Sequence, residues 1–188
     1  MLTSIPNTVI YSPSCYEELK MCLKRAVYED KCIAAVRYPR GSDNSDFDKS
    51  KLNTEYTFTD SEKRDILLIS YGRIYNEIYN AQTVLAADGI ECGLLKLTRI
   101  YPLSKDIFDR IAEYKQVIFF EESMGSGSIS EKLGAGLAER SYKGSYSRVT
   151  ADYFVKQASV QSCLEKLGLT CGKIVEYVRR RSFANGTS

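Results

Sequence analysis

The apolar positions in the first part of the chain follow two different periods. A short β-branched and aromatic run at residues 8–11 and a nearly all-apolar run at 32–37 predict strands, whereas the apolar residues of 16–28 recur at helical spacing. Pro13 and Ser14 stand where this helix should begin, and Pro39 ends the second strand because proline cannot donate to a ladder. Strand, helix and strand together predict a βαβ unit.

A longer alternating series follows between residues 64 and 181. Its predicted strands are at 65–70, 92–97, 116–121 and 147–150, and its predicted helices are at 74–87, 105–114, 129–139, 160–167 and 172–181. Helices that alternate with apolar strands are typical of α/β proteins. We therefore expect a three-layer αβα fold, in which a mostly parallel sheet is covered by helices on both faces.

Two polar stretches separate and end these units. Residues 42–63 are rich in Ser, Asp, Asn, Lys and Thr, which predicts a linker, and residues 182–188 form a polar tail. The opening block, residues 1–41, is near the size below which a unit rarely folds alone. Its strands nevertheless have the composition of strands buried on both faces. We therefore expect their remaining neighbours upstream of Met1, in a larger polypeptide.

Composition narrows the possible chemistry. The 188 residues include no histidine, which excludes a mechanism that uses a histidine of this chain as general base or metal ligand. A net charge of +2 argues against nucleic-acid binding, and the apolar runs are too short to span a membrane. The six cysteines form no C-x-x-C pair, which favours free thiols in a reducing, cytoplasmic compartment over zinc sites or disulfides.

Two arginines lie where open α/β sheets place their ligands. The string Arg37-Tyr38-Pro39-Arg40-Gly41 follows the second strand, at its carboxyl end. A guanidinium group can hold phosphate oxygens bidentately, and a glycine lets a ligand approach the backbone. The alternative is that Arg37 and Arg40 are solvated side chains at a strand exit.

A glycine-containing loop follows the predicted strand at 116–121. Its backbone N–H groups could bind an anion, but the loop lacks a phosphate-loop or dinucleotide motif and follows two carboxylates. This favours a tight turn with Ser128 as helix N-cap. Glu121 and Glu122 should point to opposite faces of the strand, which makes them a poor acid–base pair. Tyr71-Gly72 favours a close strand-to-helix turn.

Several short strings, in order along the chain, resemble the carboxyl-terminal part of transketolase-type enzymes that use thiamine diphosphate, most closely the 1-deoxy-D-xylulose-5-phosphate synthases. They are Ile5-Pro6-Asn7, Pro13-Ser14, Arg37-Tyr38-Pro39-Arg40-Gly41, Tyr101-Pro102-Leu103, Glu121-Glu122, Asp152-Tyr153-Phe154-Val155 and Leu167-Gly168-Leu169. Each string alone is weak, but their order and spacing are specific, and they cover nearly the whole chain.

The resemblance implies that residues 1–41 end the pyrimidine-binding domain and that residues 64–181 form the carboxyl-terminal domain. It implies a transferase that condenses pyruvate with glyceraldehyde 3-phosphate and releases carbon dioxide, in isoprenoid and thiamine precursor synthesis. Arg40 maps to an arginine that helps to hold the aldehyde's phosphate, with Arg37 as a weaker candidate. Thiamine diphosphate, its magnesium and the catalytic groups belong to upstream parts of such enzymes. We expect this chain alone to bind no cofactor and to be inactive.

The resemblance also implies partners, namely a second copy in a homodimer and the amino-terminal part of the enzyme. Cys15, Ser104 and Ala158 depart from the residues usual at these positions, which leaves open a split-gene relative with a separate amino-terminal subunit. The alternative interpretation is a non-catalytic α/β module that binds a partner subunit through its sheet edge or helices. A nucleotide-binding regulatory domain is disfavoured because the chain has no phosphate loop.

Overall fold

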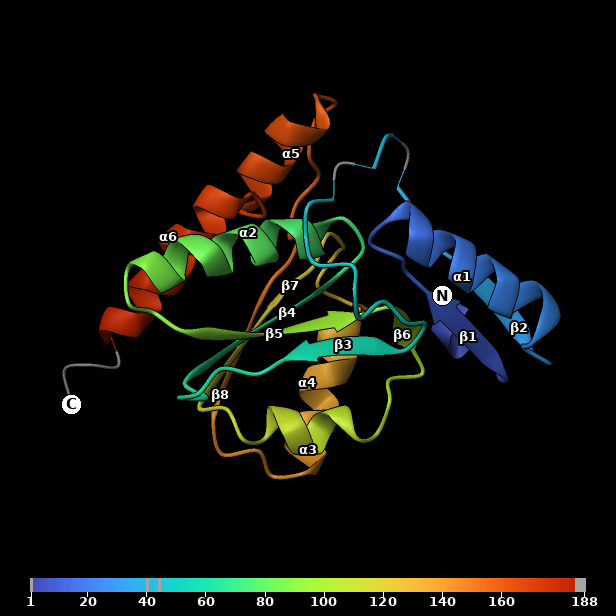
Figure 1. Ribbon diagram of the computed structural model, residues 1–188, viewed down its shortest axis with the longest axis horizontal. Coiled ribbons are helices and arrows are strands. Elements are labelled where there is room, and N and C mark those ends of the chain that lie inside the picture. The colour runs from blue at the N-terminus through green and yellow to red at the C-terminus, as the bar shows by residue number, and fades with distance from the viewer. Residues whose placement is uncertain (1, 40, 44, 185–188) are drawn as a thin grey trace.

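The computed structural model describes residues 2–39, 41–43 and 45–184 (Figure 1). In chain order, its elements are η1 (Leu2–Ser4), β1 (Thr8–Tyr11), α1 (Tyr16–Tyr28), β2 (Ile33–Val36), β3 (Tyr56–Thr59), β4 (Ile66–Tyr71), α2 (Ile74–Ala87), β5 (Cys92–Leu97), β6 (Arg99–Tyr101), α3 (Ile107–Ile111), β7 (Gln116–Phe120), α4 (Ile129–Glu139), β8 (Ser145–Val149), α5 (Val160–Leu167) and α6 (Cys171–Ala184). Within the described residues, no helix is long and apolar enough to cross a membrane.

The larger sheet has the strand order β3-β5-β4-β7-β8. β4, β5, β7 and β8 are parallel, and only the edge strand β3 is antiparallel to its neighbour. Leu68 of β4 packs in one apolar cluster with α2 and α6, whereas Leu67 packs in a second cluster with α3 and α4. Because successive strand residues point to opposite faces, this alternation confirms the predicted three-layer arrangement with helices on both faces (Figure 1).

Several elements differ from the prediction, and β8 (predicted at 147–150) begins two residues earlier than expected. β3 lies inside residues 42–63, the predicted linker, where Tyr56 and Phe58 alternate with threonines and pack against the core of the larger sheet. This short, half-polar strand carries too weak a pattern to be separated from the surrounding polar residues. The predicted helix at 105–114 is reduced to α3, and α6 continues through Ala184 into the predicted tail.

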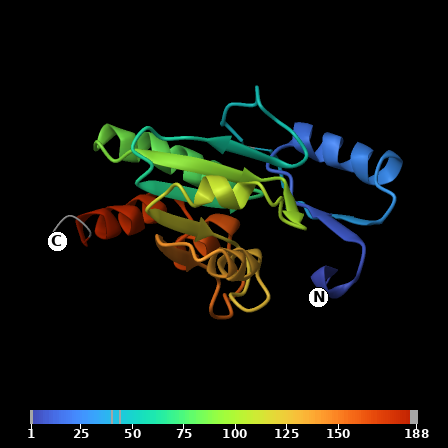
Figure 2. The same cartoon turned by 90° about the horizontal axis from the view of Figure 1, so that it is seen from below.

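The opening block contributes two strands to a smaller sheet with the order β2-β1-β6. β1 and β2 are parallel, with Thr8 opposite Ile33 and Tyr11 opposite Val36, as the βαβ prediction requires. The other neighbour of β1 is β6, which is antiparallel and follows β5 in the region that carries most of the larger sheet, residues 64–181, called the second domain below. The expectation that all remaining neighbours lie upstream is therefore wrong for β1. Figures 1 and 2 place this block at one end of the molecule, opposite the carboxyl end of α6.

A buried ion pair holds the opening block against the second domain. Lys96 on β5 and Glu18 on α1 form a salt bridge in which neither side chain is more than 2% exposed. Glu18 also accepts hydrogen bonds from the Ser14 amide at 2.9 Å and from Thr98 Oγ1 at 3.2 Å. The Lys96 ammonium lies 4.8 Å from the ring centroid of Phe47. Phe47 belongs to the segment between β2 and β3, called the connecting segment below. Residues from three parts of the chain therefore share one desolvated charge pair.

Candidate functional site

Strands from both sheets end at one crevice. β2 leads into Arg37, and β4 leads through Tyr71 into Gly72. A cavity of about 200 Å³ lies between them and is lined by Ser12, Arg37, Tyr38, Pro39, Tyr71, Gly72, Arg73, Ile74 and Glu122. Gly72 has a φ of +57°, and a Cβ atom there would lie 3.0 Å from Ser12 Oγ. The predicted close turn at Tyr71-Gly72 thus lets the opening block approach the second domain.

Arg37 ties the opening block to this edge of the larger sheet. Its Nη1 donates to Tyr71 Oη at 3.0 Å, and its Nη2 donates to the Glu122 carbonyl oxygen at 3.1 Å. The guanidinium carbon also lies 5.4 Å from the centroid of the Tyr71 ring. Part of the hydrogen-bonding capacity of Arg37 is therefore directed to protein groups rather than to a ligand. Its predicted role with a substrate phosphate stays a prediction.

Arg40, the stronger phosphate candidate, lies outside the described residues. Pro39 lines the cavity of about 200 Å³ and also a neighbouring one of about 510 Å³, and Gly41 lines the larger of the two. The larger cavity lies among the amino-terminal ends of α1 and α2, the segment after β2, and α5. The segment that carries Arg40 is thus flanked by residues that face both cavities.

Glu121 fills the amino-terminal end of α4 with a carboxylate of the chain itself. The side chain is 2% exposed and accepts hydrogen bonds from the amides of Ile129 at 3.0 Å and Ser130 at 2.8 Å, as well as from Tyr71 Oη at 2.6 Å. Ser128 caps the helix by accepting from the Glu131 amide, as predicted. The amides that might have bound an external anion are therefore already satisfied.

Glu122 points to a different partner. Arg73 donates to it with Nε at 2.7 Å and also with Nη2, in the bidentate geometry that suits a guanidinium and a carboxylate. Glu121 and Glu122 thus contact different groups, as expected for adjacent side chains that point apart. Burial, with the nearby charge of Glu121, raises the pKa of Tyr71, so its hydroxyl remains a proton donor to that carboxylate.

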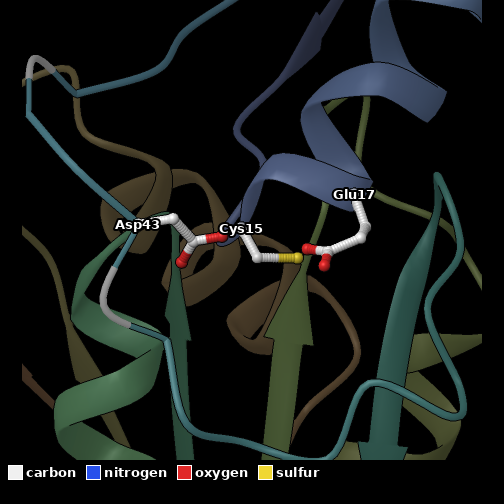
Figure 3. Close-up of side chains that lie close together, drawn as sticks. All are labelled: Cys15, Glu17 and Asp43. Carbon is white, nitrogen blue, oxygen red and sulfur yellow. The ribbon is translucent and has the colours of Figure 1, made fainter.

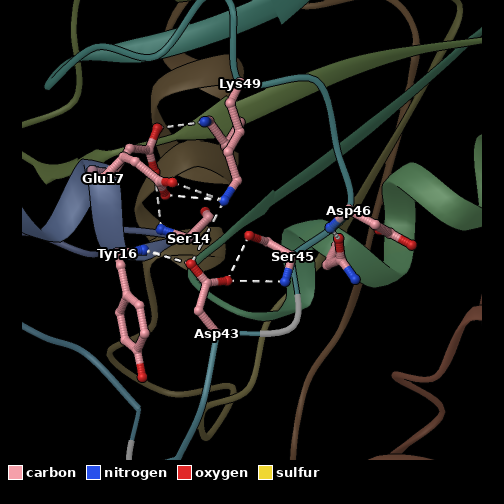
Figure 4. Close-up of polar contacts among 10 residues, drawn as sticks. Ser14, Tyr16, Glu17, Asp43, Ser45, Asp46 and Lys49 are labelled. Carbon is pink, nitrogen blue, oxygen red and sulfur yellow. Dashed lines mark hydrogen bonds and ion pairs between the residues drawn. The ribbon is translucent and has the colours of Figure 1, made fainter.

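A cluster of possible metal ligands borders the larger cavity. One ligand atom each from Cys15, Glu17 and Asp43 lies within 4.8 Å of the others (Figure 3). The Lys49 ammonium lies 3.0 Å from Glu17 Oε2 and 3.8 Å from Asp43 Oδ2 (Figure 4). Burial also raises the pKa of the Cys15 thiol to about 11, so it is not a thiolate near neutral pH. Lys49 therefore supplies the positive charge that this cluster requires.

Asp43 has a structural role at the start of α1. Its Oδ2 accepts from the Tyr16 amide at 2.8 Å, and its Oδ1 accepts from the Ser45 amide at 2.9 Å (Figure 4). Partial burial acts to raise the pKa of Asp43, but the hydrogen bonds from Ser45 and Tyr16 outweigh it and hold this pKa below its ordinary value. Asp43 thus links the connecting segment to the first turn of α1.

Comparison with known proteins identifies relatives of both parts of the chain. The family model described as the transketolase C-terminal domain matches residues 55–174. A 1-deoxy-D-xylulose-5-phosphate synthase of Helicobacter pylori strain G27 is 28% identical over 181 residues, which cover 94% of this chain and 29% of the relative. The synthase of Clostridium acetobutylicum is 31% identical over 147 residues, or 76% of this chain and 23% of the relative. The chain thus spans under a third of the length of these relatives.

Solved structures with the same fold include two transketolases. A structure titled as a split-gene transketolase in an inactive beta4 tetramer has a TM-score of 0.78 at 19% identity and covers 95% of this chain and 59% of that one. Transketolase from Campylobacter jejuni has a TM-score of 0.69 at 15% identity and covers 95% of this chain and 27% of that one. At these identities the likeness concerns the fold.

Proposed function

Because the chain belongs to the family of transketolase carboxyl-terminal domains, we propose that it supplies the carboxyl-terminal part of a 1-deoxy-D-xylulose-5-phosphate synthase-like transferase. The complete enzyme would condense pyruvate with glyceraldehyde 3-phosphate and release carbon dioxide. The observation that carries this proposal is the similarity to such synthases over 94% of the chain, which includes the opening block as well as the second domain.

We propose that thiamine diphosphate and magnesium are held by the remainder of the enzyme. Among the described residues, the carboxylates that line the two cavities already have protein partners: Asp43 accepts from the Tyr16 amide, Glu77 accepts from the Cys171 amide, and Glu122 binds Arg73. Nearby, Glu121 binds the start of α4 and Glu17 binds Lys49. These groups do not fit a diphosphate and its metal. Calorimetric titration of the isolated chain with thiamine diphosphate and magnesium should therefore give no binding heat, and a micromolar affinity would contradict this proposal.

Within the assembled enzyme, we propose that Arg40 binds the phosphate of the aldehyde substrate. We also propose that Arg37 positions Tyr38 and Pro39, the two residues that precede Arg40. The supporting observations are the contacts of Arg37 with Tyr71 and Glu122, and the position of Pro39 and Gly41 beside the cavities. This crevice lies at carboxyl ends of strands, where α/β proteins bind ligands. A charged hydrogen bond to one substrate contributes about 1.5–3 kcal/mol.

The test is steady-state kinetics of the assembled enzyme with Arg40→Ala. We expect the KM for glyceraldehyde 3-phosphate to rise about 10–100-fold, since each 1.4 kcal/mol corresponds to a factor of ten, while the KM for pyruvate changes little. Arg180→Ala, which removes an exposed arginine of α6, is the control. Equal effects of Arg40→Ala on both substrates would refute the phosphate role, and absence of product from the unaltered assembled enzyme would refute the function itself.

The missing part would lie on the same polypeptide or on a separate subunit. The split-gene title of one solved neighbour supports the second arrangement. In either arrangement we propose a homodimer of the complete enzyme. The alternative, a non-catalytic module that only binds a partner, predicts that the assembled protein binds its partner without turnover of pyruvate.

A further inference from the structure

The cavity of about 200 Å³ beside Gly72 carries more positive than negative charge. Its charged lining residues are Arg37, Arg73 and Glu122. Glu122 neutralises one of the two guanidinium groups, because Nε and Nη2 of Arg73 both bind its carboxylate. Arg37 has no carboxylate partner among the described residues, since its Nη1 and Nη2 donate to a hydroxyl and to a carbonyl oxygen. One positive charge at this cavity is therefore not balanced by the chain.

Both guanidinium groups keep hydrogen-bonding capacity for a ligand. Nη1 of Arg73 and Nε of Arg37 make no hydrogen bond to another described residue. The side chain of Arg73 is 31% exposed, so a ligand in the cavity can reach it. A guanidinium group has five N–H donors, and Glu122 holds that of Arg73 by one edge only. The remaining donors can bind an oxyanion without breaking the ion pair.

Ser12 adds a hydroxyl group that has no protein partner. The residue lies between β1 and α1, lines the same cavity and is only 3% exposed. Its amide donates to the Thr98 carbonyl oxygen at 2.7 Å, but its Oγ makes no hydrogen bond to another described residue. This Oγ lies beside Gly72, 3.0 Å from where a Cβ atom would stand. Because buried polar groups are normally hydrogen-bonded, the Ser12 hydroxyl requires water or a ligand in the cavity.

The amino-terminal end of α2 favours an anion at this place. Ile74, the first residue of this 14-residue helix, lines the cavity, and no side chain caps the helix by a hydrogen bond. At the start of α4, by contrast, the buried carboxylate of Glu121 accepts from the helix amides. The first amides of a helix carry partial positive charge. The start of α2 therefore lacks the anionic group that the chain supplies to α4.

We propose that this cavity binds a phosphate group through Arg73 and Ser12, while Arg37 and the start of α2 contribute positive charge. About 200 Å³ equals the liquid volume of roughly seven water molecules and lies below the roughly 300–1,000 Å³ of sites for larger organic ligands. A phosphate group offers three strong acceptor oxygens, enough for donors from β1, β2 and α2. The phosphate belongs to the aldehyde substrate or is free inorganic phosphate, and only the first source rests on the proposed function.

Calorimetric titration of the chain with inorganic phosphate tests the site without catalysis. We expect saturable binding that Arg73→Gln weakens at least about tenfold, because a hydrogen bond between charged groups is lost. Ser12→Ala should weaken binding about threefold or more, because it removes one neutral donor. The matched control is Arg179→Gln, since Arg179 also binds a carboxylate, that of Asp88, through Nε and Nη2 but lies on α6. It should leave phosphate binding unchanged.

Two results of this titration would overturn the inference. One is the absence of saturable phosphate binding by the unaltered chain. The other is equal binding by the Arg73→Gln and Arg179→Gln variants, which would place the phosphate elsewhere on the surface. Circular dichroism shows whether each variant folds. If Arg73→Gln does not fold, Ser12→Ala decides, and unaltered phosphate binding by that variant would then overturn the inference.

Kinetics of the assembled enzyme identify the source of the phosphate. If it belongs to the substrate, Arg73→Gln should raise the KM for glyceraldehyde 3-phosphate at least about tenfold and leave the KM for unphosphorylated glyceraldehyde unchanged. Inorganic phosphate should then compete with the phosphorylated aldehyde. If the chain binds phosphate through Arg73 without such competition and without a change of KM, the ligand is free phosphate.

The inference and the proposed function fail in different experiments. Phosphate binding that depends on Arg73, in a chain whose assembled enzyme forms no deoxyxylulose phosphate, would support the site and refute the proposed function. Product formation by an assembled enzyme whose chain binds no phosphate would support the function and overturn the site.

Discussion

β4 and β2 have similar apolar sequences but very different surroundings. All six residues of β4 are buried between two helical layers, whereas Ile33 of β2 is exposed and the other three residues are only partly buried. In the larger sheet, each strand has neighbours and covering helices from the same region of the chain. The described part of the opening block has α1 and two strands of its own, and the third strand of its sheet, β6, comes from the second domain. β2 therefore has the composition of an interior strand in an edge position, whereas the edge strands of the larger sheet carry polar residues.

Breaking the buried ion pair between the two regions should lower the free energy of unfolding more than any other change considered below. Lys96→Met removes the cation from a pair in which Glu18 remains fully buried, and loss of one partner from such a pair costs about 3–5 kcal/mol. The free energy of unfolding in urea at pH 7 measures this cost. The double variant Glu18→Leu with Lys96→Met removes both charges and should recover much of the loss. A cost below about 1 kcal/mol for Lys96→Met would mean that the two regions are not joined by this pair.

Truncation of one apolar residue in each sheet compares the regions directly. Leu68→Ala in β4 should lower the free energy of unfolding by about 2–5 kcal/mol, because it leaves a cavity between two packed layers. Ile33→Ala in β2 should change it by less than about 0.5 kcal/mol in the isolated chain, because half of that side chain is already exposed. Similar costs at the two positions in urea unfolding would contradict the contrast between a completed and an open sheet.

The sequence predicts the interior strands of the larger sheet. It does not predict which strands and side chains join the two regions. The apolar runs at residues 65–70 and 92–97 predict interior strands, and the structure confirms them as β4 and β5. β6, by contrast, has only three residues and follows β5 after a single residue, so no period marks it as the second neighbour of β1. The pair of Glu18 and Lys96 is separated by 78 residues, and only tertiary packing brings it together.

At the crevice, removal of the Tyr71 hydroxyl should weaken the contact between the two regions. Tyr71→Phe removes an acceptor from Arg37 and a donor to the buried carboxylate of Glu121, so we expect a cost of about 1.5–3 kcal/mol. Tyr142→Phe, which removes a hydroxyl bonded to a neutral carbonyl within the second domain, is the control and should cost about 1 kcal/mol. A smaller cost for Tyr71→Phe than for this control, measured by urea unfolding, would contradict the bridging role.

The candidate site was only partly predictable, because tertiary packing decides which distant residues meet there. The position of Arg37 at a strand exit follows from the pattern, and so does the turn with Ser128 as N-cap. The direction of each side chain does not, because it depends on partners from other elements. Arg37 contacts Tyr71 from β4, and Glu121 turns to the start of α4, so both depend on how strands of different sheets converge. The local sequence predicts where a strand ends, but it does not predict which side chains of neighbouring strands lie beside that end.

The smallest expected effect concerns the connecting segment, and its pH dependence has a definite sign. The pKa of Asp43 lies below its ordinary value of 3.8 in the folded chain. Its contribution to stability is therefore complete above the unfolded pKa and is lost as the pH falls through the folded pKa, where the native carboxylate takes up a proton. Asp43→Asn should cost about 1 kcal/mol at pH 7, as for the loss of a helix cap, and progressively less toward pH 2.

Urea unfolding of both chains at a series of pH values from 7 to 2 measures this difference. Asp109→Asn replaces an exposed aspartate on α3 and should show little difference at any pH in this range. A cost of Asp43→Asn that grows as the pH falls would mean that the folded pKa is raised rather than lowered. The carboxylate would then not fix the start of α1, and the opening block would depend for its position on the buried pair of Glu18 and Lys96 and on the contacts of Arg37.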